Sequence, residues 1–275
     1  MKTGIFAVVF SLVVGTGFAE DLSTVPTADE IVRKANHVSL YQGVDSKGTV
    51  TMTITDRQGR VRKRQFNMLR RDDDQSDHDQ KYFVLFQSPA DVRKMVFMVH
   101  KHADLKKDDD RWLYMPSLDL VKRIAASDKR TSFVGSDFLY EDISGRSPDE
   151  DKHELIRTTD HHYILKNIPE NPESVEFEYY IVHVDKKTFM PMKMQFFKTG
   201  DRLYRVLEST KLEGIQAEEN GKQVIYPTVT ESVARDLENG SATKVVFSNI
   251  RYNVGLSGKL FTERYLRRPP RDAMR

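Results

Sequence analysis

The sequence predicts a mainly β fold, of the α+β kind, built on an antiparallel sheet. Short runs with apolar residues at every second position recur between residues 50 and 250. Turn-forming segments separate several of these runs, and no helix-length apolar pattern lies between most of them. Strands that follow one another through short turns pair as an antiparallel meander, so these observations together indicate the fold class.

The N-terminus has the layout of a secretory signal peptide. Lys2 precedes the apolar run Ile5–Val14, and Gly17 and Ala19 place small residues at positions −3 and −1 of a cleavage site. The apolar run is too short to anchor the chain across a bilayer. We therefore expect residues 1–19 to be a cleaved signal peptide and the mature chain to be a soluble protein of the bacterial periplasm.

The first element of the mature chain is predicted to be an amphipathic helix. Thr27 and Glu30 form a capping box, in which each side chain accepts a hydrogen bond from a free backbone N–H of the other residue. Apolar residues then recur at helical spacing from Ile31 to Val38. We expect this helix to end near Gly43.

Ten strand-like runs follow, with two short helical interruptions. The runs are Val50–Ile54, Phe66–Met68, Tyr82–Phe86, Met95–Val99, Trp112–Met115, Val175–Val184, Met190–Phe197, Leu203–Leu207, Val229–Val233 and Lys244–Ile250. One helical segment is expected within Ser132–Ile143, where Gly135–Asp137 would cap it, and the other within Lys259–Leu266. No convincing linker interrupts the pattern, so residues 20–275 are predicted to form a single domain.

The predicted sheet has a wet face and an apolar face that is rich in methionine. In the Met190–Phe197 run, Met192, Met194 and Phe196 share one face and polar residues take the other. In the Val175–Val184 run, alternation places Phe177 and Tyr179 on the apolar face. Methionine adapts to varied apolar shapes, so this face permits a ligand cavity, although a filled core with methionine as gap-filler would give the same pattern.

Composition excludes several functional classes. The chain contains no cysteine, which rules out disulfides, a cysteine nucleophile, thiolate metal sites and lipidation at an N-terminal cysteine. Its formal net charge is +2, which indicates no nucleic-acid partner. Because it has no cysteine that could be lipidated, the chain is not itself a lipoprotein.

The most distinctive stretch of sequence lies between residues 111 and 143. It comprises Arg111–Ser117, Arg123–Asp128 and Ser132–Ile143. Together with the N-terminal helix and the C-terminal segments Asn249–Asn253 and Leu260–Thr262, it resembles the outer-membrane lipoprotein-sorting family. This family comprises the LolA-like periplasmic carriers, and the resemblance is strongest to its larger branch of uncharacterised secreted proteins.

The resemblance implies a curved antiparallel sheet, an incomplete LolA/LolB-like barrel whose concave face is covered by helices. In the carriers the hydrophobic interior holds the acyl chains of lipids or lipoproteins, without a cofactor or catalytic activity. Members of the larger branch are often associated with RND-type inner-membrane exporters, which suggests a partner. Because the receptor of the sorting system needs an N-terminal cysteine, this chain fits the carrier better than the receptor.

Strand parity and the resemblance together give candidate ligand-binding residues. The cavity is predicted to be lined by Met52, Phe66, Met68, Phe97, Trp112, Tyr114, Phe177, Tyr179, Met192, Met194 and Phe196. The lid over it is predicted to contain Phe133, Gly135, Phe138, Leu139 and Tyr140. A register error of one residue in any strand would move its set to the other face.

Three alternatives remain open at this point. The Met190–Met194 row together with His100 and His102 could bind Cu(I), since thioethers select that ion. Ser136 and Asp137 could in principle join a histidine in a hydrolase, although no nucleophile-elbow motif is present. The third alternative is a scaffold or exporter accessory that binds protein without lipid cargo, which a filled interior would favour over a hollow one.

Overall fold

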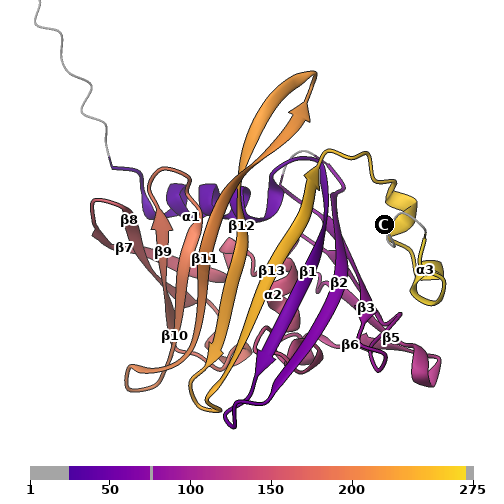
Figure 1. The fold of residues 1–275 in the computed structure, drawn as a ribbon. Coiled ribbons are helices and arrows are strands. Elements are labelled where there is room, and N and C mark those ends of the chain that lie inside the picture. Colours follow the sequence, from indigo (N-terminus) through magenta and orange to yellow (C-terminus); the bar gives the residue numbers. More distant parts are fainter. Residues whose placement is uncertain (1–24, 75–76, 271–275) are drawn as a thin grey trace, which may run out of the picture.

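The architecture is one open antiparallel sheet of 13 strands, curved into an incomplete barrel (Figure 1). A computed structural model of the chain describes residues 25–74 and 77–270, so the predicted signal peptide lies outside the described residues. The strands are β1 Asp45–Thr55, β2 Val61–Asp72, β3 Gln80–Ser88, β4 Val96–Lys101, β5 Asp110–Met115, β6 Leu120–Ile124, β7 Asp151–Thr158, β8 His162–Pro169, β9 Tyr179–Asp185, β10 Pro191–Lys198, β11 Arg202–Glu219, β12 Lys222–Asp236 and β13 Ser241–Tyr252.

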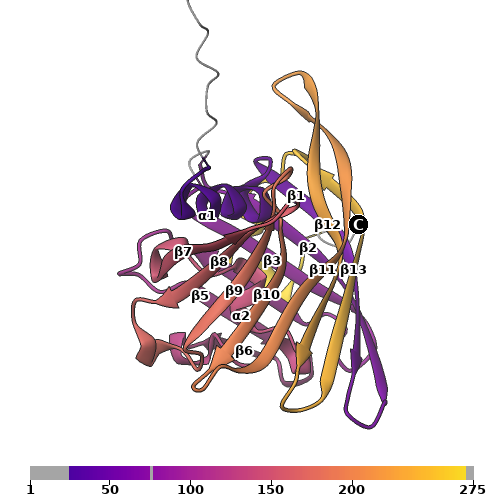
Figure 2. The ribbon, with the colours of Figure 1, turned by 90° about the vertical axis from the view of Figure 1, so that its left-hand side faces the viewer.

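The two edges of the sheet are formed by strands that are consecutive in the sequence. The spatial order is β6-β5-β4-β3-β2-β1-β13-β12-β11-β10-β9-β8-β7, so β6 and β7 lie at opposite ends. Residues 125–150 connect them across the concave side, where Figure 2 shows α2 (Tyr140–Ser144) inside the curve and α1 (Ala28–Asn36) across one end. The expected fold class, an incomplete barrel with helices over its concave face, is confirmed.

The N-terminal helix forms as the capping box predicts. The backbone N–H of Thr27 donates to Glu30 Oε2 at 2.8 Å, and the N–H of Glu30 donates to Thr27 Oγ1 at 3.3 Å. Helix α1 is followed by a π-helical turn, η1 (His37–Tyr41), and its apolar side faces the concave wall, where Ile31 is fully buried. The helix therefore covers the sheet at the end where the chain enters it.

The remaining helices are shorter than the sequence suggested. They are α3 Arg264–Arg267 and the 3-10 turns η2 Pro116–Leu118, η3 Ala126–Asp128, η4 Phe133–Gly135, η5 Pro148–Glu150, η6 Pro172–Ser174 and η7 Gly258–Leu260. The expected cap at Gly135–Asp137 is wrong, because α2 begins only at Tyr140. None of the helices in the described part of the chain is long and apolar enough to cross a bilayer.

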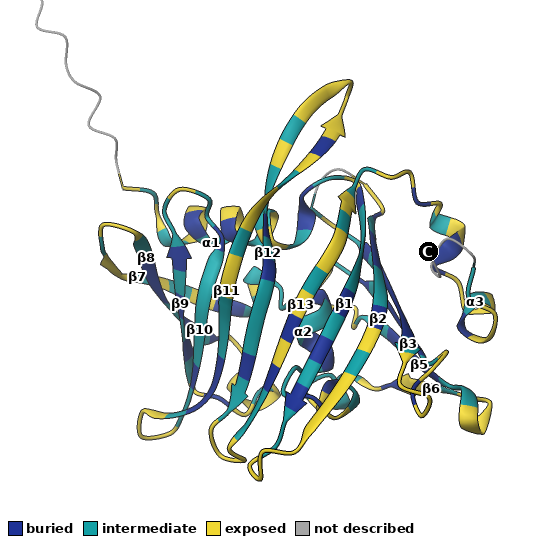
Figure 3. Cartoon of the chain, viewed as in Figure 1, coloured by how far each residue is buried: buried dark blue, intermediate teal, exposed yellow. Residues whose placement is uncertain are grey.

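Strands β3 and β4, with the second half of β2 and part of β5, are buried on both faces. Their concave face meets the segment between β6 and β7, and their convex face is covered by the C-terminal segment through Leu256, Leu260, Phe261 and Leu266. Five consecutive residues of β3, Tyr82–Phe86, are consequently buried, and Figure 3 draws β3 mainly in the colour of buried residues. A strand that is apolar on both faces does not alternate. Its sequence therefore does not show which side chains point to the concave face.

The sequence patterns do not predict three of the strands, β6, β7 and β8. The short edge strand β6 has mostly exposed residues, and β7 is polar apart from the adjacent pair Leu155 and Ile156, so it shows no alternation. Strand β8 has three consecutive buried residues near its start and carries no clear alternation. Both β11 and β12 also extend well beyond the runs Leu203–Leu207 and Val229–Val233, and they form a hairpin that projects from the sheet (Figure 1).

Candidate functional site

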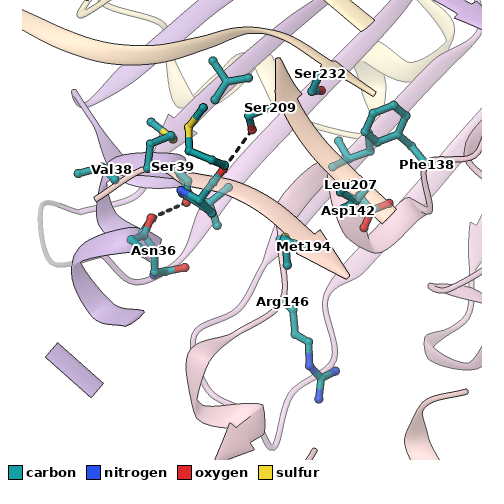
Figure 4. Close-up of a pocket in the computed structure, with 18 of the residues that line it drawn as sticks. Asn36, Val38, Ser39, Phe138, Asp142, Arg146, Met194, Leu207, Ser209 and Ser232 are labelled. Atoms are coloured by element: carbon teal, nitrogen blue, oxygen red, sulfur yellow. Dashed lines mark hydrogen bonds between the residues drawn. The ribbon is translucent and has the colours of Figure 1, made fainter. Parts of the chain in front are cut away.

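The concave face encloses a cavity of about 480 Å³ on the side of β1 and β8–β13. Its walls come from the sheet, its outer end is covered by α1 and η1, and its base is the segment between β6 and β7. Figure 4 shows Val38 from η1, Leu207 from β11 and Phe138 from the base around the same space. The cavity therefore joins residues from both ends and the middle of the chain.

The walls of the cavity are mainly apolar. Side chains of this kind that line it include Val32, Val38, Leu40, Val50, Met52, Phe66, Met68, Phe138, Ile143, Leu165, Val182, Val184, Met190, Met192, Met194, Phe196, Leu207, Val229, Val245, Phe247 and Ile250. Cavities of roughly 300–1,000 Å³ with such walls are typical of sites that bury small apolar ligands. Taking about 30 Å³ for a methylene group, roughly that of a water molecule, about 16 methylene groups would fill the space.

The methionine row forms one continuous part of this wall. Met194 pairs with Val182 and Phe196 pairs with Tyr180 across the β9–β10 ladder, and directly paired residues share a face. Met190 is 3 % exposed, whereas Met192 and Met194 are half-buried and border the open space. Flexible thioethers at this wall can follow the shape of more than one hydrocarbon ligand.

The other half of the concave face is filled by Phe133. This side chain is fully buried, and its ring centroid lies 5.4 Å from that of Phe97, 5.5 Å from that of Tyr140 and 6.2 Å from that of Phe66. Phe133 and Tyr140 therefore belong to the packed core and form a fixed plug. Of the five residues predicted for the lid, only Phe138 lines the cavity, while Gly135 and Leu139 lie outside its wall.

The plug segment is attached to the sheet by polar contacts as well as by packing. Asp137, expected to cap a helix, instead accepts hydrogen bonds from the hydroxyls of Ser241 and Thr243 on β13. Asp142 forms a salt bridge with Arg205 on β11 and accepts from the backbone N–H of Leu139 at 2.6 Å. These bonds link the base of the cavity to its wall.

Below the apolar walls lies a compact network of ion pairs. Its basic members are Lys129, Arg130, Arg146 and Arg205, and its acidic members are Glu141, Asp142, Glu150, Asp151 and Glu176. Burial raises the pKa of Glu141, but Arg130 and Lys129 outweigh it and hold that pKa below its ordinary value. Because each of the four basic members pairs with an acidic one, the network itself offers an anionic headgroup no uncompensated cation.

Two arginines of that network lie against aromatic rings, and part of the network, including Arg130, Arg146 and Arg205, lines the base of the hollow. The guanidinium of Arg205 lies 5.1 Å from the ring centroid of Phe196, and that of Arg130 lies 4.7 Å from the ring centroid of Phe177. Tyr180 donates a hydrogen bond to Asp151 at 2.8 Å, and burial together with this carboxylate raises the pKa of Tyr180 well above its ordinary value. The charges at the base of the hollow are thus paired with one another.

At the covered end, Arg70 holds η1 in place. Its guanidinium donates to the carbonyl oxygens of Leu40 at 2.6 Å, Gln42 at 2.8 Å and Gly43 at 2.6 Å, which would otherwise lack partners at the end of the turn. It also binds Asp72 at 2.9 Å, and burial raises the pKa of this aspartate to about 6. Arg70 thereby fixes the segment that covers the cavity.

A buried lysine supports the base from the other half of the sheet. Lys101 on β4 donates from Nζ to the backbone oxygen of Ser144, the last residue of α2, at 2.8 Å. The Lys101 residue is 5 % exposed, and burial lowers its pKa to about 8. Lys101 therefore links β4 to the segment that closes the cavity.

Six of the eleven predicted cavity residues line the hollow. These are Met52, Phe66, Met68, Met192, Met194 and Phe196, and their contact with a ligand stays a prediction. Phe97 lies on the concave face but is covered by the plug, and Phe177 lies in the base beneath the arginines. The parity argument therefore chose the correct face of β1, β2, β4 and β10.

The predicted cavity positions of Trp112, Tyr114 and Tyr179 are wrong. Trp112 and Tyr114 pair with Met98 and Val96 and lie on the convex face under the C-terminal segment, because the concave positions of β5 belong to Arg111 and Leu113. Tyr179 stacks on the outer face against Phe197 at 4.8 Å between ring centroids. The regular strand β9 begins only at Tyr179, so the parity of the preceding Phe177 does not continue into it.

Several residues of the site were missed by sequence reasoning. The η1 turn, Arg70 and Arg205 gave no signal, because their partners are far away in the sequence. Val182 and Val184 could have been found, since they alternate with the more polar His183 and were available as the apolar face of β9. Their neighbour Tyr179 misled the assignment because it is large and aromatic.

The alternative sites do not assemble. His100 projects from the convex face, where it bonds to the backbone oxygen of Phe261 at 2.8 Å, so it lies on the opposite face from the methionine row. Ser136 donates to the backbone oxygen of Phe133 at 2.8 Å and contacts no histidine in the hydrogen bonds described. Within residues 25–74 and 77–270, no three His, Asp or Glu side chains are grouped to hold a metal ion.

Comparisons with known proteins agree with this geometry. A model for a family described as an uncharacterized protein matches residues 78–268, while no curated protein matches the chain. A DUF1329 family protein from Desulfovibrio piger is 29 % identical, with 87 % of this chain and 97 % of that chain covered and a TM-score of 0.76.

Two further solved structures share the fold. A putative outer membrane lipoprotein-sorting protein domain from Vibrio parahaemolyticus is 24 % identical, with 88 % and 98 % of the two chains covered and a TM-score of 0.74. A LolA superfamily protein from Nitrosomonas europaea is 20 % identical, with 88 % and 100 % covered and a TM-score of 0.61. Because the family model spans most of the chain, the chain belongs to the DUF1329 family, and the solved structures show that it has the LolA-like fold.

Proposed function

We propose that the protein is a non-catalytic periplasmic carrier that binds the acyl chain of a lipid or lipoprotein in the cavity. The observation that carries this proposal is the hollow of about 480 Å³ with apolar walls, inside a fold shared with lipoprotein-sorting proteins. A core that existed only for stability would be filled, as the half occupied by Phe133 is. The hollow half is thus better explained by a ligand than by packing.

The size and charge of the cavity favour a single hydrocarbon chain. About 16 methylene groups at about 0.8 kcal/mol each would contribute roughly 13 kcal/mol before the costs of binding, which suffices for tight retention. The balanced ion pairs at the base give no reason for an anionic headgroup to enter first. We infer that the chain end enters the hollow and that the polar end stays near η1.

The proposal includes the cellular setting that the sequence indicates. Residues 1–19 would direct export and be removed after Ala19, and residues 20–275 would act as one domain. The cargo would be delivered in an outer-membrane sorting pathway or passed to or from an RND-type exporter of the inner membrane. Sequencing the N-terminus of the exported protein and copurification with a co-expressed exporter would test these two points.

The experiment that tests the carrier function is native mass spectrometry of mature protein purified gently from periplasm, with organic extraction of bound material. A stoichiometric lipid or acylated peptide is the expected result, and its identity would name the cargo class. A mass without any adduct, unchanged after incubation with mixed envelope lipids, would contradict the proposal and favour a protein-binding scaffold.

A further inference from the structure

The β11–β12 hairpin continues well past the rest of the sheet. Strand β11 pairs with β10 only as far as Glu208, and β12 pairs with β13 only from Glu231 onward. Beyond these points the two strands pair only with each other, up to the turn between Glu219 and Lys222. A two-stranded ribbon is marginally stable on its own, so its projection at the covered end of the cavity calls for an explanation (Figure 2).

The projecting ribbon has one apolar face. Ile215 pairs with Tyr226 and Ala217 pairs with Val224, so the four side chains lie on the same face, which we call the ledge. Each ledge residue is buried or half-buried, whereas most other residues of the ribbon are exposed, as the alternating colours in Figure 3 show. The opposite face carries Ile225, which is 66 % exposed.

The ledge is continuous with the lining of the cavity. The ring centroid of Tyr226 lies 4.9 Å from that of Tyr252, and the Tyr252 hydroxyl lies 2.9 Å from Thr228 Oγ1. Both Tyr252 and Thr228 line the cavity. Gln42 of the covering segment also donates to the Pro227 oxygen at 2.7 Å, which fixes the base of the ribbon beside η1. The contact between the rings of Tyr226 and Tyr252 therefore joins the ledge to the lining of the cavity.

The volume of the cavity suggests why a ligand with two chains would need an apolar surface outside it. At roughly 30 Å³ for each methylene group, one acyl chain of about 16 methylene groups matches the volume of about 480 Å³. A second chain in water would lose the stabilisation of burial, about 0.8 kcal/mol for each methylene group. The ledge is an apolar surface outside the cavity, and the ring of Tyr226 joins it to Tyr252 in the cavity lining.

We propose that the ledge binds the second hydrocarbon chain of a two-chain ligand whose first chain occupies the cavity; this inference rests on the proposed carrier function. The tip of the ribbon does not favour docking on an anionic bilayer, because it carries two carboxylates, Glu218 and Glu219, against one cation, Lys222. The ledge thus selects two-chain lipids over single-chain ones.

The test compares a one-chain probe with a two-chain probe on the purified mature chain. Binding of palmitate and uptake of palmitoyl-oleoyl phosphatidylglycerol from vesicles are measured by native mass spectrometry. Ile215→Asp should weaken uptake of the two-chain lipid by about tenfold or more and leave palmitate binding unchanged. Ile225→Asp, the same change on the opposite face of the ribbon, should alter neither.

A second variant guards against local misfolding of the ribbon. Replacing residues 216–225 by Asn-Gly joins Ile215 to Tyr226 through a two-residue turn, removes half of the ledge and leaves Pro227 in place. It should also lower two-chain uptake selectively. If uptake of the two-chain lipid survives both changes, or if binding of both probes falls equally, the proposed role of the ledge is wrong. If the wild-type protein binds palmitate but no two-chain lipid, only the proposed role of the ledge is wrong. If it binds neither probe, the proposed carrier function is wrong as well.

Discussion

Met194 lies in the middle of β10 on the cavity wall, so an aspartate at this position should expel the ligand. Met194 is directly opposite Val182 and next to Phe196 on the same face, and all three line the hollow. A carboxylate there would keep its hydration shell, because burying an unpaired charge among apolar groups is costly. Water around it would occupy space that the hydrocarbon needs.

The magnitude follows from the contacts that would be lost. If the hydration shell of the new carboxylate excludes about four methylene groups at about 0.8 kcal/mol each, binding weakens by about 3 kcal/mol. That corresponds to a rise in Kd of roughly 140-fold, since about 1.4 kcal/mol equals a factor of ten. The assay is titration of the purified Met194→Asp variant with palmitate, followed by native mass spectrometry.

Gln195→Asp supplies the matched control. Gln195 is the next residue on the same strand, it pairs with Ile181 on the outer face, and it is half-buried. The same substitution there should leave the palmitate Kd within about twofold of wild type, because a surface change of this kind alters energies by about 0.5 kcal/mol or less. A folded Met194→Asp protein that binds palmitate as tightly as wild type would refute the assignment of the cavity wall.

Three further predictions concern stability and the plug. Phe133→Ala should lower the free energy of unfolding in urea by about 3–5 kcal/mol, while Phe138→Ala should mainly raise the palmitate Kd; the reverse would mean that Phe133 acts as a mobile lid. Arg70→Gln should cost about 3 kcal/mol in the same assay because buried carbonyl groups lose their partner, with the exposed Arg62→Gln as a near-neutral control. The stability of wild type relative to Lys101→Met should rise between about pH 8 and pH 10.5, where the folded chain has released a proton that the unfolded chain still holds; a flat or falling difference would contradict the buried position of this ammonium.

Strands β10 and β5 show how much of the site could be predicted from the sequence. Alternation in β10 identified the concave positions because its outer residues, Lys193 and Gln195, are polar. In β5 the concave positions are Arg111 and Leu113, and both faces are covered, so the larger aromatic residues pointed to the wrong side. Parity is informative only where one face meets water.

A break in a strand has a similar effect. The segment before Tyr179 is irregular, and a single residue out of register moves every following side chain to the other face. Phe177 and Tyr179 therefore share parity in the sequence but not a face in the structure. No local pattern in this segment shows where regular pairing begins.

The sequence by itself determined the capped first helix, the antiparallel character of the sheet and the family, because each depends on residues that are close together in the chain. Only the tertiary structure decided which half of the concave face is filled and which is hollow. That division depends on contacts such as Asp142 with Arg205 and Phe133 with Phe66, which join residues far apart in the sequence. Such contacts depend on how the sheet curves and where the segment between its edge strands comes to lie, and no local sequence pattern records either.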